Sequence, residues 1–472
     1  MAQKWWTLTA VVAGVFMLVL DITIVNVALP AIGQDFHSSL SDLQWVIDAY
    51  ALALAAGLLT AGSLADLWGR RRLYAVGTAV FTAGSLLCAL ATGPLFLSLA
   101  RTGQGVGGAI VWATSLALLS DAFQGRERGV AFGIYGGVLG IAVAVGPVLG
   151  GALTSGLSWR WIFWVNVPIG IAVAVATLTK LRESRNPAAS RPDWLGFVTF
   201  SAALALLVYG LISAGDGWSQ PKVYGTLIGA AVLLAVFLVL EAVQQHPMLD
   251  LSLFRKPTFN GGLVAAVGLN GSIYTLITYL VLYLQQHLGF SPAQTGVRLL
   301  VLTGAMFVSS TVAGRLSTAV PVRLMISAGF VLIAAGIALM TGVSDTSSWT
   351  HLLPGMVVAG IGAGMVTVPL ASTAVGVVAP AQAGTASGIN ATARQVGLAT
   401  GIAALGTVFT SRSATSGFAD GLNEILWIGA AVALAAAVLS AVLIRQRDFV
   451  SPAAAPAAGK EAPAAVADAE AR

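Results

Sequence analysis

The sequence predicts an all-α membrane protein of fourteen transmembrane helices, arranged as two six-helix bundles with two further helices inserted between them. Three observations lead to this expectation: the composition, a series of long apolar runs and a faint internal repeat. Of the 472 residues, 57% are hydrophobic and only 9% are charged. Soluble domains carry about 25% charged residues, so the bilayer must solvate much of this chain.

Fourteen mostly apolar runs are long enough to cross a bilayer, which takes roughly 20 residues of helix. Only helices satisfy their backbone hydrogen bonds internally over such lengths, so the predicted class is all-α. The runs begin near Leu8, Gln44, Leu73, Leu95, Gly129, Trp161, Trp194, Tyr224, Phe259, Gln294, Leu324, His351, Gly384 and Glu424.

Charge placement predicts the orientation. With the N-terminus inside, most of the 24 lysines and arginines fall on the inner face, as the positive-inside rule requires. Moving one span boundary would flip every later loop, so this agreement also supports an even number of spans. We therefore expect an N-in, C-in, multi-pass protein of the cytoplasmic (inner) membrane. The net charge of +5 follows from this topology and does not indicate nucleic-acid binding.

Two short residue patterns recur weakly at nearly the same sequence separation, which indicates a duplicated unit, as in transporters built from parallel repeats. Residues Gly62, Leu64 and Arg71 recur 252 positions later as Gly314, Leu316 and Arg323, and Gly105-Val-Gly107 recurs 255 positions later as Gly360-Ile-Gly362. The predicted division is a bundle over 1–182, a linker with two inserted helices over 183–256, a second bundle over 257–447, and a disordered Ala- and Pro-rich tail over 448–472.

Ionisable residues inside spans are costly and are functional candidates by default. Asp21 is the best candidate for a proton carrier, because burial disfavours its charged form while a nearby arginine favours it. Arg101 is its natural partner. A fixed structural Asp–Arg pair and a neutral, hydrogen-bonded Asp21 remain alternatives. Asp48 is a second proton site, a counter-charge for cationic substrates, or a carboxylate solvated at the cavity mouth.

Further polar side chains share helix faces with these residues. Gln104 and Trp112 continue the face of Arg101, which is otherwise a packing face with an incidental arginine. In the predicted thirteenth span, Asn390 and Arg394 lie on one polar face that points at a cavity or a neighbouring helix. Asn26, Asn270 and Tyr274 suit a cavity for amphipathic ligands, although tyrosines near span ends are often interface anchors.

Small residues dominate the predicted fifth span, in which Gly140 and Gly151 belong to a stripe that permits close helix contact and Pro147 bends the helix. This helix either pivots or seals the halves together. The loop after the second span holds Gly62, Asp66, Gly69 and Arg70, and Asp66 is suited to accept hydrogen bonds from a helix N-terminus of the other half and so close an inner gate.

Several ordered motifs resemble the major facilitator superfamily, and specifically its fourteen-span drug:proton antiporters, the multidrug and methylenomycin-resistance type. The resemblance covers all fourteen spans. It rests on Leu20-Asp21-Ile-Thr-Ile-Val-Asn26, Gly62-Ser-Leu-Ala-Asp66-Leu-Trp-Gly69-Arg70, Arg101-Thr-Gly-Gln104-Gly105, the span-five segment with Gly140, Gly146-Pro147 and Gly150-Gly151, and Trp159-Arg-Trp161-Ile-Phe163-Trp-Val-Asn166.

The resemblance implies a major facilitator fold in which Asp21, Arg101 and Gln104 couple protons and Asp66 and Arg70 gate. It implies proton-coupled export of small amphipathic drugs or antibiotics by alternating access. A dedicated exporter of one metabolite or self-made antibiotic is the alternative, and a non-transporting membrane sensor is a remote one. The expected partners are protons, an amphipathic substrate and lipid, with no nucleic acid, and the protein is expected to be a monomer.

Enzyme chemistry has no support in the sequence. The four histidines are scattered without metal-ligand spacing, so neither a metal nor any other cofactor is expected. The single cysteine, Cys88, lies in an apolar run and is expected to be a packed residue.

Overall fold

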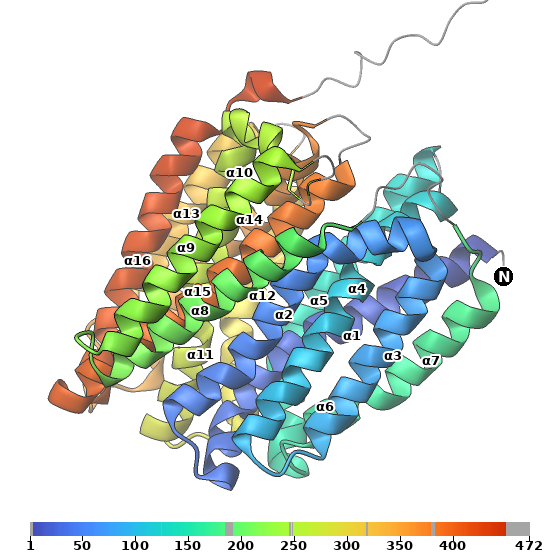
Figure 1. The fold of residues 1–472 in the computed structure, drawn as a ribbon. Coiled ribbons are helices and arrows are strands. Elements are labelled where there is room, and N and C mark those ends of the chain that lie inside the picture. The colour runs from blue at the N-terminus through green and yellow to red at the C-terminus, as the bar shows by residue number, and fades with distance from the viewer. Residues whose placement is uncertain are drawn as a thin grey trace, which may run out of the picture.

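The computed structural model describes residues 3–123, 125–184, 192–244, 247, 249–317, 320–378 and 383–449. Every regular element in these ranges is helical, which confirms the all-α prediction. The predicted disordered tail lies almost entirely outside the described residues. Figure 1 shows the helices as a tight group of long, roughly parallel rods.

The helices begin within a few residues of the predicted starts, most of them earlier and the one at Leu353 slightly later. The first group is α1 (Gln3–Phe36), α2 (Leu40–Trp68), α3 (Arg70–Ala89), α4 (Pro94–Ala122), α5 (Gly125–Gly156), α6 (Trp161–Trp164) and α7 (Asn166–Lys180). The next pair is α8 (Trp194–Ser213) and α9 (Pro221–Val243). The last group is α10 (Pro257–Leu269), η3 (Asn270–Tyr274), α11 (Thr275–Leu282), η4 (Tyr283–His287), α12 (Pro292–Leu316), α13 (Val322–Leu339), α14 (Leu353–Val375), α15 (Ala383–Ser416) and α16 (Phe418–Leu443). One rod is divided between α6 and α7, and another contains the π-helical turns η3 and η4.

Twelve helical rods in the described part of the chain are long and apolar enough to cross a membrane. The two long helices outside that set are α2 and α15, with 29 and 34 residues. Large apolar side chains also cover the outside of the bundle: Leu99 is 64% exposed, Val308 63% and Val239 61%. Such a surface is stable in lipid and not in water. The chain is therefore a multi-pass membrane protein.

The internal repeat appears in the structure as equivalent helix contacts. Gly107 of α4 lies so close to α3 that an added Cβ would sit 2.3 Å from the Phe81 amide nitrogen. Gly362 of α14 lies equally close to α13, and its added Cβ would sit 2.7 Å from the Ile333 nitrogen. Only glycine permits such an approach.

Two capping boxes mark the same repeat. At the start of α2, Ser39 and Asp42 satisfy each other's backbone N–H groups, and at the start of α12 Ser291 and Gln294 do the same. Each box fixes the first turn of a helix by satisfying two otherwise unpaired donors. Because the boxes are 252 residues apart, α2 and α12 hold equivalent places in the two halves.

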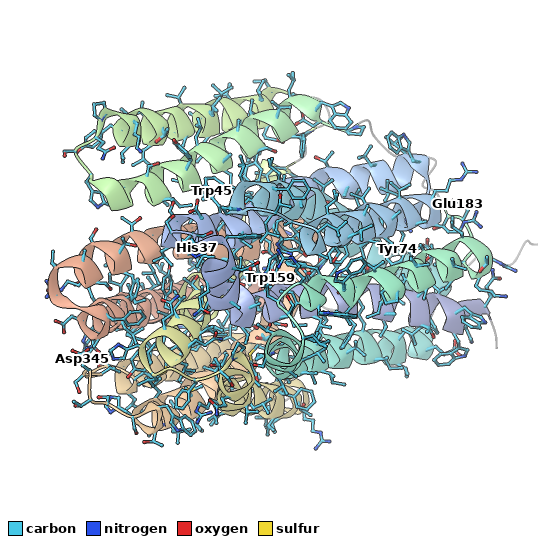
Figure 2. All side chains as sticks on the ribbon, turned by 90° about the horizontal axis from the view of Figure 1, so that it is seen from below. His37, Trp45, Tyr74, Trp159, Glu183 and Asp345 are labelled. Carbon is cyan, nitrogen blue, oxygen red and sulfur yellow. The ribbon has the colours of Figure 1, made fainter. Side chains whose placement is uncertain are left out.

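Helices α8 and α9 lie along the seam between the halves (Figure 1). Helix α8 contacts both α2 of the first group and α15 of the last. The Thr407 hydroxyl on α15 donates to the Leu211 carbonyl at 2.5 Å. On the other side, the rings of Trp45 and Tyr209 lie 6.3 Å apart, where Trp45 faces the α8–α9 pair in Figure 2. The inserted pair is thus docked on both halves at once.

Two ends of the bundle are used below as landmarks. The Gln3 end is where α1 begins, and Glu183 lies there too, since Gln3 Nε2 donates to the nearby Lys180 carbonyl at 3.0 Å. The His37 end is opposite, and Figure 2 shows His37 and Asp345 at that end.

Candidate functional site

A buried ion pair occupies the middle of the first half. Asp21 on α1 is 0% exposed and Arg101 on α4 is 1% exposed. Arg101 Nη1 donates to Asp21 Oδ2 at 2.5 Å and to Gln104 Oε1 at 2.7 Å. Gln104 Nε2 in turn donates to Asp21 Oδ1 at 2.9 Å. The three residues predicted to act together therefore form one hydrogen-bonded cluster.

A fourth member of this cluster, Asn166, was not predicted. Its Nδ2 donates to Asp21 Oδ1 at 2.9 Å and to Ser85 Oγ at 3.1 Å. Asn166 is the first residue of α7, directly after the break that separates α6 from α7. Its Oδ1 has no hydrogen-bond partner among the described residues. An amide in the apolar segment that follows Trp161 was a usable signal, but the amides selected from the sequence were Gln104, Asn26, Asn270 and Asn390.

Arg101 is also held from the α2 side. Its Nε donates to the Val46 carbonyl at 3.2 Å, and its guanidinium lies 4.1 Å from the centre of the Tyr50 ring. Removing one partner of such a pair leaves an uncompensated buried charge, which costs about 3–5 kcal/mol. While the pair is intact, each buried charge is compensated by the other. Any step that neutralises Asp21 must therefore also release Arg101.

A testable consequence concerns Asn166. We expect Asn166→Leu to lower export activity by about tenfold, because Asp21 loses a hydrogen bond to a charged group worth about 1.5–3 kcal/mol. Export by Thr177→Val, a change at another buried residue of α7 whose hydroxyl bonds only its own helix, should stay near wild type. Equal activity of both variants would show that Asn166 plays no part in the cluster.

Asp48 lies apart from this cluster, at the seam between the halves. It is 0% exposed, and neither carboxylate oxygen has a hydrogen-bond partner among the described residues. It lies within electrostatic range of Tyr279 on α11. The Tyr279 hydroxyl donates to the Ile402 carbonyl at 2.8 Å, and Gln44 Nε2 donates to the same oxygen at 2.9 Å. The alternative that Asp48 is solvated at a mouth is therefore wrong for this conformation.

The predicted gating loop is a sharp junction between α2 and α3. Gly69 has φ 104°, a left-handed conformation that glycine adopts without strain. The carboxylate of Glu183 accepts from the Arg71 and Arg72 amides at 3.0 and 3.3 Å, and so caps the start of α3. This acid comes from the same half, just after α7.

The charged residues of that loop also bond within the first half. Arg70 Nη1 donates to Asp121 Oδ2 on α4 at 2.7 Å. A Cβ added at Gly62 would meet no atom of another described element within 4 Å. The side chain of Asp66 lies outside the described part of the structure, so its predicted contact with the other half stays a prediction.

Helix α5 packs between α1 and α12 through its glycines. Towards α1, an added Cβ at Gly150 would lie 2.9 Å from the Ile24 carbonyl oxygen, and one at Gly146 would collide with the Thr23 hydroxyl. Towards α12, Gly151 abuts the backbone of Pro292 and Gly140 abuts the Phe307 ring. The predicted stripe thus brings α5 into contact with both halves.

Pro147 and its surroundings complete this seam. Pro147 lies inside α5, and an added Cβ at Gly296 of α12 would press on its carbonyl oxygen. The Thr303 hydroxyl donates to the Ala144 carbonyl at 3.5 Å, one turn further towards the Gln3 end. The α5–α12 contact therefore runs from the middle of the bundle to its His37 end.

The same seam is open towards the Gln3 end. Gly133 and Gly137 continue the α5 face that carries Gly140, but no atom of another described element lies within 4 Å of their added Cβ atoms. On α12, a Cβ added at Gly314 would likewise meet no described atom of another element within 4 Å. The two halves meet at the His37 end and diverge at the Gln3 end.

Hydrogen bonds between the halves follow the same distribution. They join Gln285 Nε2 to the Val27 carbonyl at 2.8 Å, Thr278 Oγ1 to Asn26 Oδ1 at 3.3 Å, Ala293 N to Ser155 Oγ at 3.0 Å and Thr392 Oγ1 to the Ala55 carbonyl at 3.3 Å. Asn26, predicted as a cavity residue, therefore belongs to the closed seam in this conformation.

The remaining predicted cavity residues are dispersed. Trp112 is half-buried against the core of the first half. Asn270 Nδ2 donates within its own rod, to the Ala266 carbonyl at 3.0 Å, and the Tyr274 hydroxyl lies 3.6 Å from Met306 Sδ. Asn390 Oδ1 accepts from Arg394 Nε at 3.4 Å. Asn390 and Arg394 are therefore bonded to each other, but the set as a whole does not form one hydrogen-bonded cluster.

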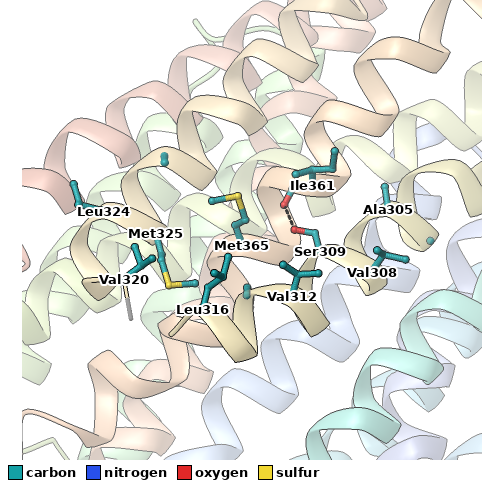
Figure 3. A pocket seen from close by; sticks show the side chains of 13 residues that line it. Ala305, Val308, Ser309, Val312, Leu316, Val320, Leu324, Met325, Ile361 and Met365 are labelled. Carbon is teal, nitrogen blue, oxygen red and sulfur yellow. Dashed lines mark hydrogen bonds between the residues drawn. The ribbon is translucent and has the colours of Figure 1, made fainter. Parts of the chain in front are cut away.

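A cavity of about 610 Å³ lies elsewhere, between α12, α13 and α14 (Figure 3). Apolar side chains such as Val312, Leu316 and Met365 line it, and its one hydroxyl, on Ser309, is engaged by the Ile361 carbonyl at 2.6 Å. It contains none of the predicted site residues, so it is not the candidate site. No group of three metal-binding side chains occurs within the described ranges.

Comparison with known proteins gives consistent matches. The family model described as Major Facilitator Superfamily matches residues 11–402 and 263–469. The puromycin resistance protein of Streptomyces alboniger is 37% identical over 464 residues, covering 94% of this chain and 92% of that protein. The multidrug resistance protein Stp of Mycobacterium tuberculosis is 37% identical over 407 residues, covering 86% of this chain and 76% of the relative.

A third relative and a solved structure are also similar to this chain. The tetracenomycin C resistance and export protein of Streptomyces glaucescens is 37% identical over 420 residues, covering 87% of this chain and 77% of the relative. A bacterial homologue of the human lysosomal transporter Spinster, solved in an inward-facing and occupied conformation, superposes with a TM-score of 0.69 at 18% identity. That alignment covers 96% of this chain and 99% of the solved chain.

Proposed function

The chain belongs to the major facilitator superfamily, and from this premise we propose that it is a proton-coupled antiporter exporting small amphipathic drugs or antibiotics across the cytoplasmic membrane. The observation that carries the proposal is the dry cluster of Asp21, Arg101, Gln104 and Asn166. A buried acid with its charge compensated by one arginine can exchange that partner for a proton. The names of the relatives, which are resistance and export proteins, support the export role.

The proposed topology has fourteen spans with both termini in the cytoplasm. Twelve spans are the rods that meet the length and apolarity criteria, and α2 and α15 supply the other two. Both are long enough, and both pack against spanning helices along their length. The domain limits remain those expected from the sequence: bundles over 1–182 and 257–447, the inserted pair within 183–256 and a tail over 448–472.

With this orientation the Gln3 end is cytoplasmic, and the structure is closed outside and open inside. The Asp21–Arg101 pair is then the state after proton release to the cytoplasm. Substrate binds from the inside, and the halves rock about the α5–α12 and α2–α15 seams to open the outer end. A proton from outside then neutralises Asp21, frees Arg101, and permits return to the inward-facing state.

Asp48 adds a second step at the outer gate. An ionised carboxylate buried without a partner is very costly. We therefore assign Asp48 a proton while the outer end is closed and expect it to release that proton when the seam with Tyr279 opens. The protein is proposed to act as a monomer, because each half supplies one wall of the same cavity.

A resistance profile tests this function. Expression in a drug-sensitive bacterium should raise the inhibitory concentration of several unrelated amphipathic antibiotics, and a proton uncoupler should restore dye accumulation to the level of cells without the transporter. Protection against one compound alone would favour a dedicated exporter. This alternative is a specific one, because two relatives are each named for a single antibiotic. Dye export that survives the uncoupler would contradict proton coupling.

A further inference from the structure

Arg394 is a cation in the middle of α15 that the proposed proton cycle does not use. Its Nε donates to Asn390 Oδ1 at 3.4 Å, and Asn390 Nδ2 lies 3.5 Å from the Gly262 carbonyl. Unlike Arg101, it forms no ion pair with any carboxylate of the described residues. Arg394 is partly exposed, whereas Arg101 is buried. A charge at this depth without a counter-charge is costly and needs a function.

Two phenols lie within electrostatic range of this guanidinium. Tyr274 comes from the second half, and Tyr135 comes from α5 of the first half. Tyr135 is only 8% exposed, and its hydroxyl has no hydrogen-bond partner among the described residues. A buried hydroxyl without a hydrogen-bond partner and a cation without a counter-charge thus lie within electrostatic range of each other, although they come from opposite halves. A bound anion would satisfy both.

The charges nearby decide which sign of substrate is favoured. Asp21 is neutralised by Arg101, and both are sealed from the cavity. Asp48 is 0% exposed and lies in the closed seam. Among the described groups at this depth, the accessible charge is therefore the positive one of Arg394. In a cavity of low dielectric constant this charge attracts anions and repels cations.

Resting on the proposed export function, we infer that the transported molecules carry an acidic group, a carboxylate or an acidic phenol or enol, which Arg394 binds with the help of Tyr135. A guanidinium presents a planar fork of donors that matches two oxygens of a carboxylate or of a phenolate with an adjacent carbonyl. Asn390 positions this fork by accepting from its Nε. This narrows the substrate class from amphipathic molecules in general to amphipathic acids.

The test is binding of two probes with one scaffold, rhodamine B with its free carboxylate and the ethyl ester of rhodamine B, to purified protein by fluorescence anisotropy. The wild type should bind the acid at least about tenfold more tightly than the ester, the worth of one hydrogen bond to a charged group. Arg394→Gln should abolish this preference by weakening binding of the acid without weakening binding of the cationic ester, and Arg394→Lys should retain part of it.

The matched control is Arg412→Gln. Arg412 also lies on α15, but it is half-exposed and pairs with Glu424 at 3.1 Å near the other end of the helix. It should keep the full preference for the acid. Equal affinity of the wild type for both probes, no binding of the acid, or a loss of ester binding in Arg394→Gln as large as the loss of acid binding would overturn the inference.

Transport of both probes into inverted proteoliposomes separates this inference from the proposed function. Proton-driven uptake of the ester together with equal affinity for acid and ester would overturn the inference and leave the export function standing. A clear preference for the acid in binding, without transport of either probe, would uphold the inference and contradict the export function.

Discussion

Replacing Asp21 by asparagine will reduce proton-driven export to the level of cells without the transporter, while the protein still reaches the membrane. Asparagine offers a single acceptor oxygen in place of the two that accept from Arg101 Nη1 and Gln104 Nε2, and it leaves the Arg101 charge without its counter-charge. An amide does not carry a proton, so the coupling step is lost even in protein that has folded and reached the membrane. Dye efflux from energised cells, normalised to the amount of protein in the membrane, measures the effect.

Asp35 provides a matched control on the same helix. It also accepts from an arginine, Arg160 Nη1 at 2.8 Å, but the Asp35 side chain is 44% exposed. An exposed ion pair contributes about 0–1 kcal/mol, so Asp35→Asn should export at close to the wild-type rate. Normal efflux by Asp21→Asn would show that this carboxylate is not the proton carrier, and the Asp21–Arg101 pair would then be a fixed structural element.

Substituting Gly151 by alanine will force α5 and α12 apart at the His37 end and open the outer seam. The added methyl group would clash with the Pro292 carbonyl oxygen. Because this is a backbone atom, no side-chain rotation can relieve the clash. Overpacking of this kind costs typically about 1–3 kcal/mol. If that cost falls on the closed conformation alone, the ratio of open to closed outer gates rises by roughly 5- to 150-fold.

Cysteine accessibility measures this shift. Thr278 is 4% exposed and bonds to Asn26 across the closed seam. Thr278→Cys should react slowly with a membrane-impermeant maleimide added outside, and much faster when Gly151→Ala is also present. The native Cys88 is buried and contributes little background.

Gly156→Ala is the control for the Gly151 substitution, because a Cβ added at Gly156 on the same helix would meet no described atom of another element within 4 Å. It should leave both labelling and efflux unchanged. Unchanged labelling in Gly151→Ala would contradict the assignment of the α5–α12 seam as the outer gate.

The sequence predicted the helices and the Asp21–Arg101 pair because few arrangements were open to either. Long apolar runs leave few alternatives to spanning helices, and few ionisable residues fall inside them. Asp21 and Arg101 were therefore paired correctly, although 80 residues separate them. Asn166 was missed because its role depends on the break between α6 and α7, which turns its amide towards α1. A break of that kind does not follow from composition.

The seams were less predictable, because they depend on how two halves approach each other. The glycine stripe of α5 indicated close packing, but its neighbours on α1 and α12 are known only from the fold. Likewise, the acid that caps the start of α3 is Glu183, more than a hundred residues along the chain from Arg71. Asp48 was assigned three roles from the sequence, and its burial against the second half removes the solvated one.

The central claim is that substrate and protons move in opposite directions through one alternating site. The most direct measurement is proton flux in proteoliposomes loaded with a pH-sensitive dye, with an outward substrate gradient imposed in the absence of any pH gradient. We expect wild-type protein to acidify the lumen as substrate leaves, and Asp21→Asn to show no such proton movement. Substrate efflux from wild-type vesicles with no change of lumenal pH would contradict the account.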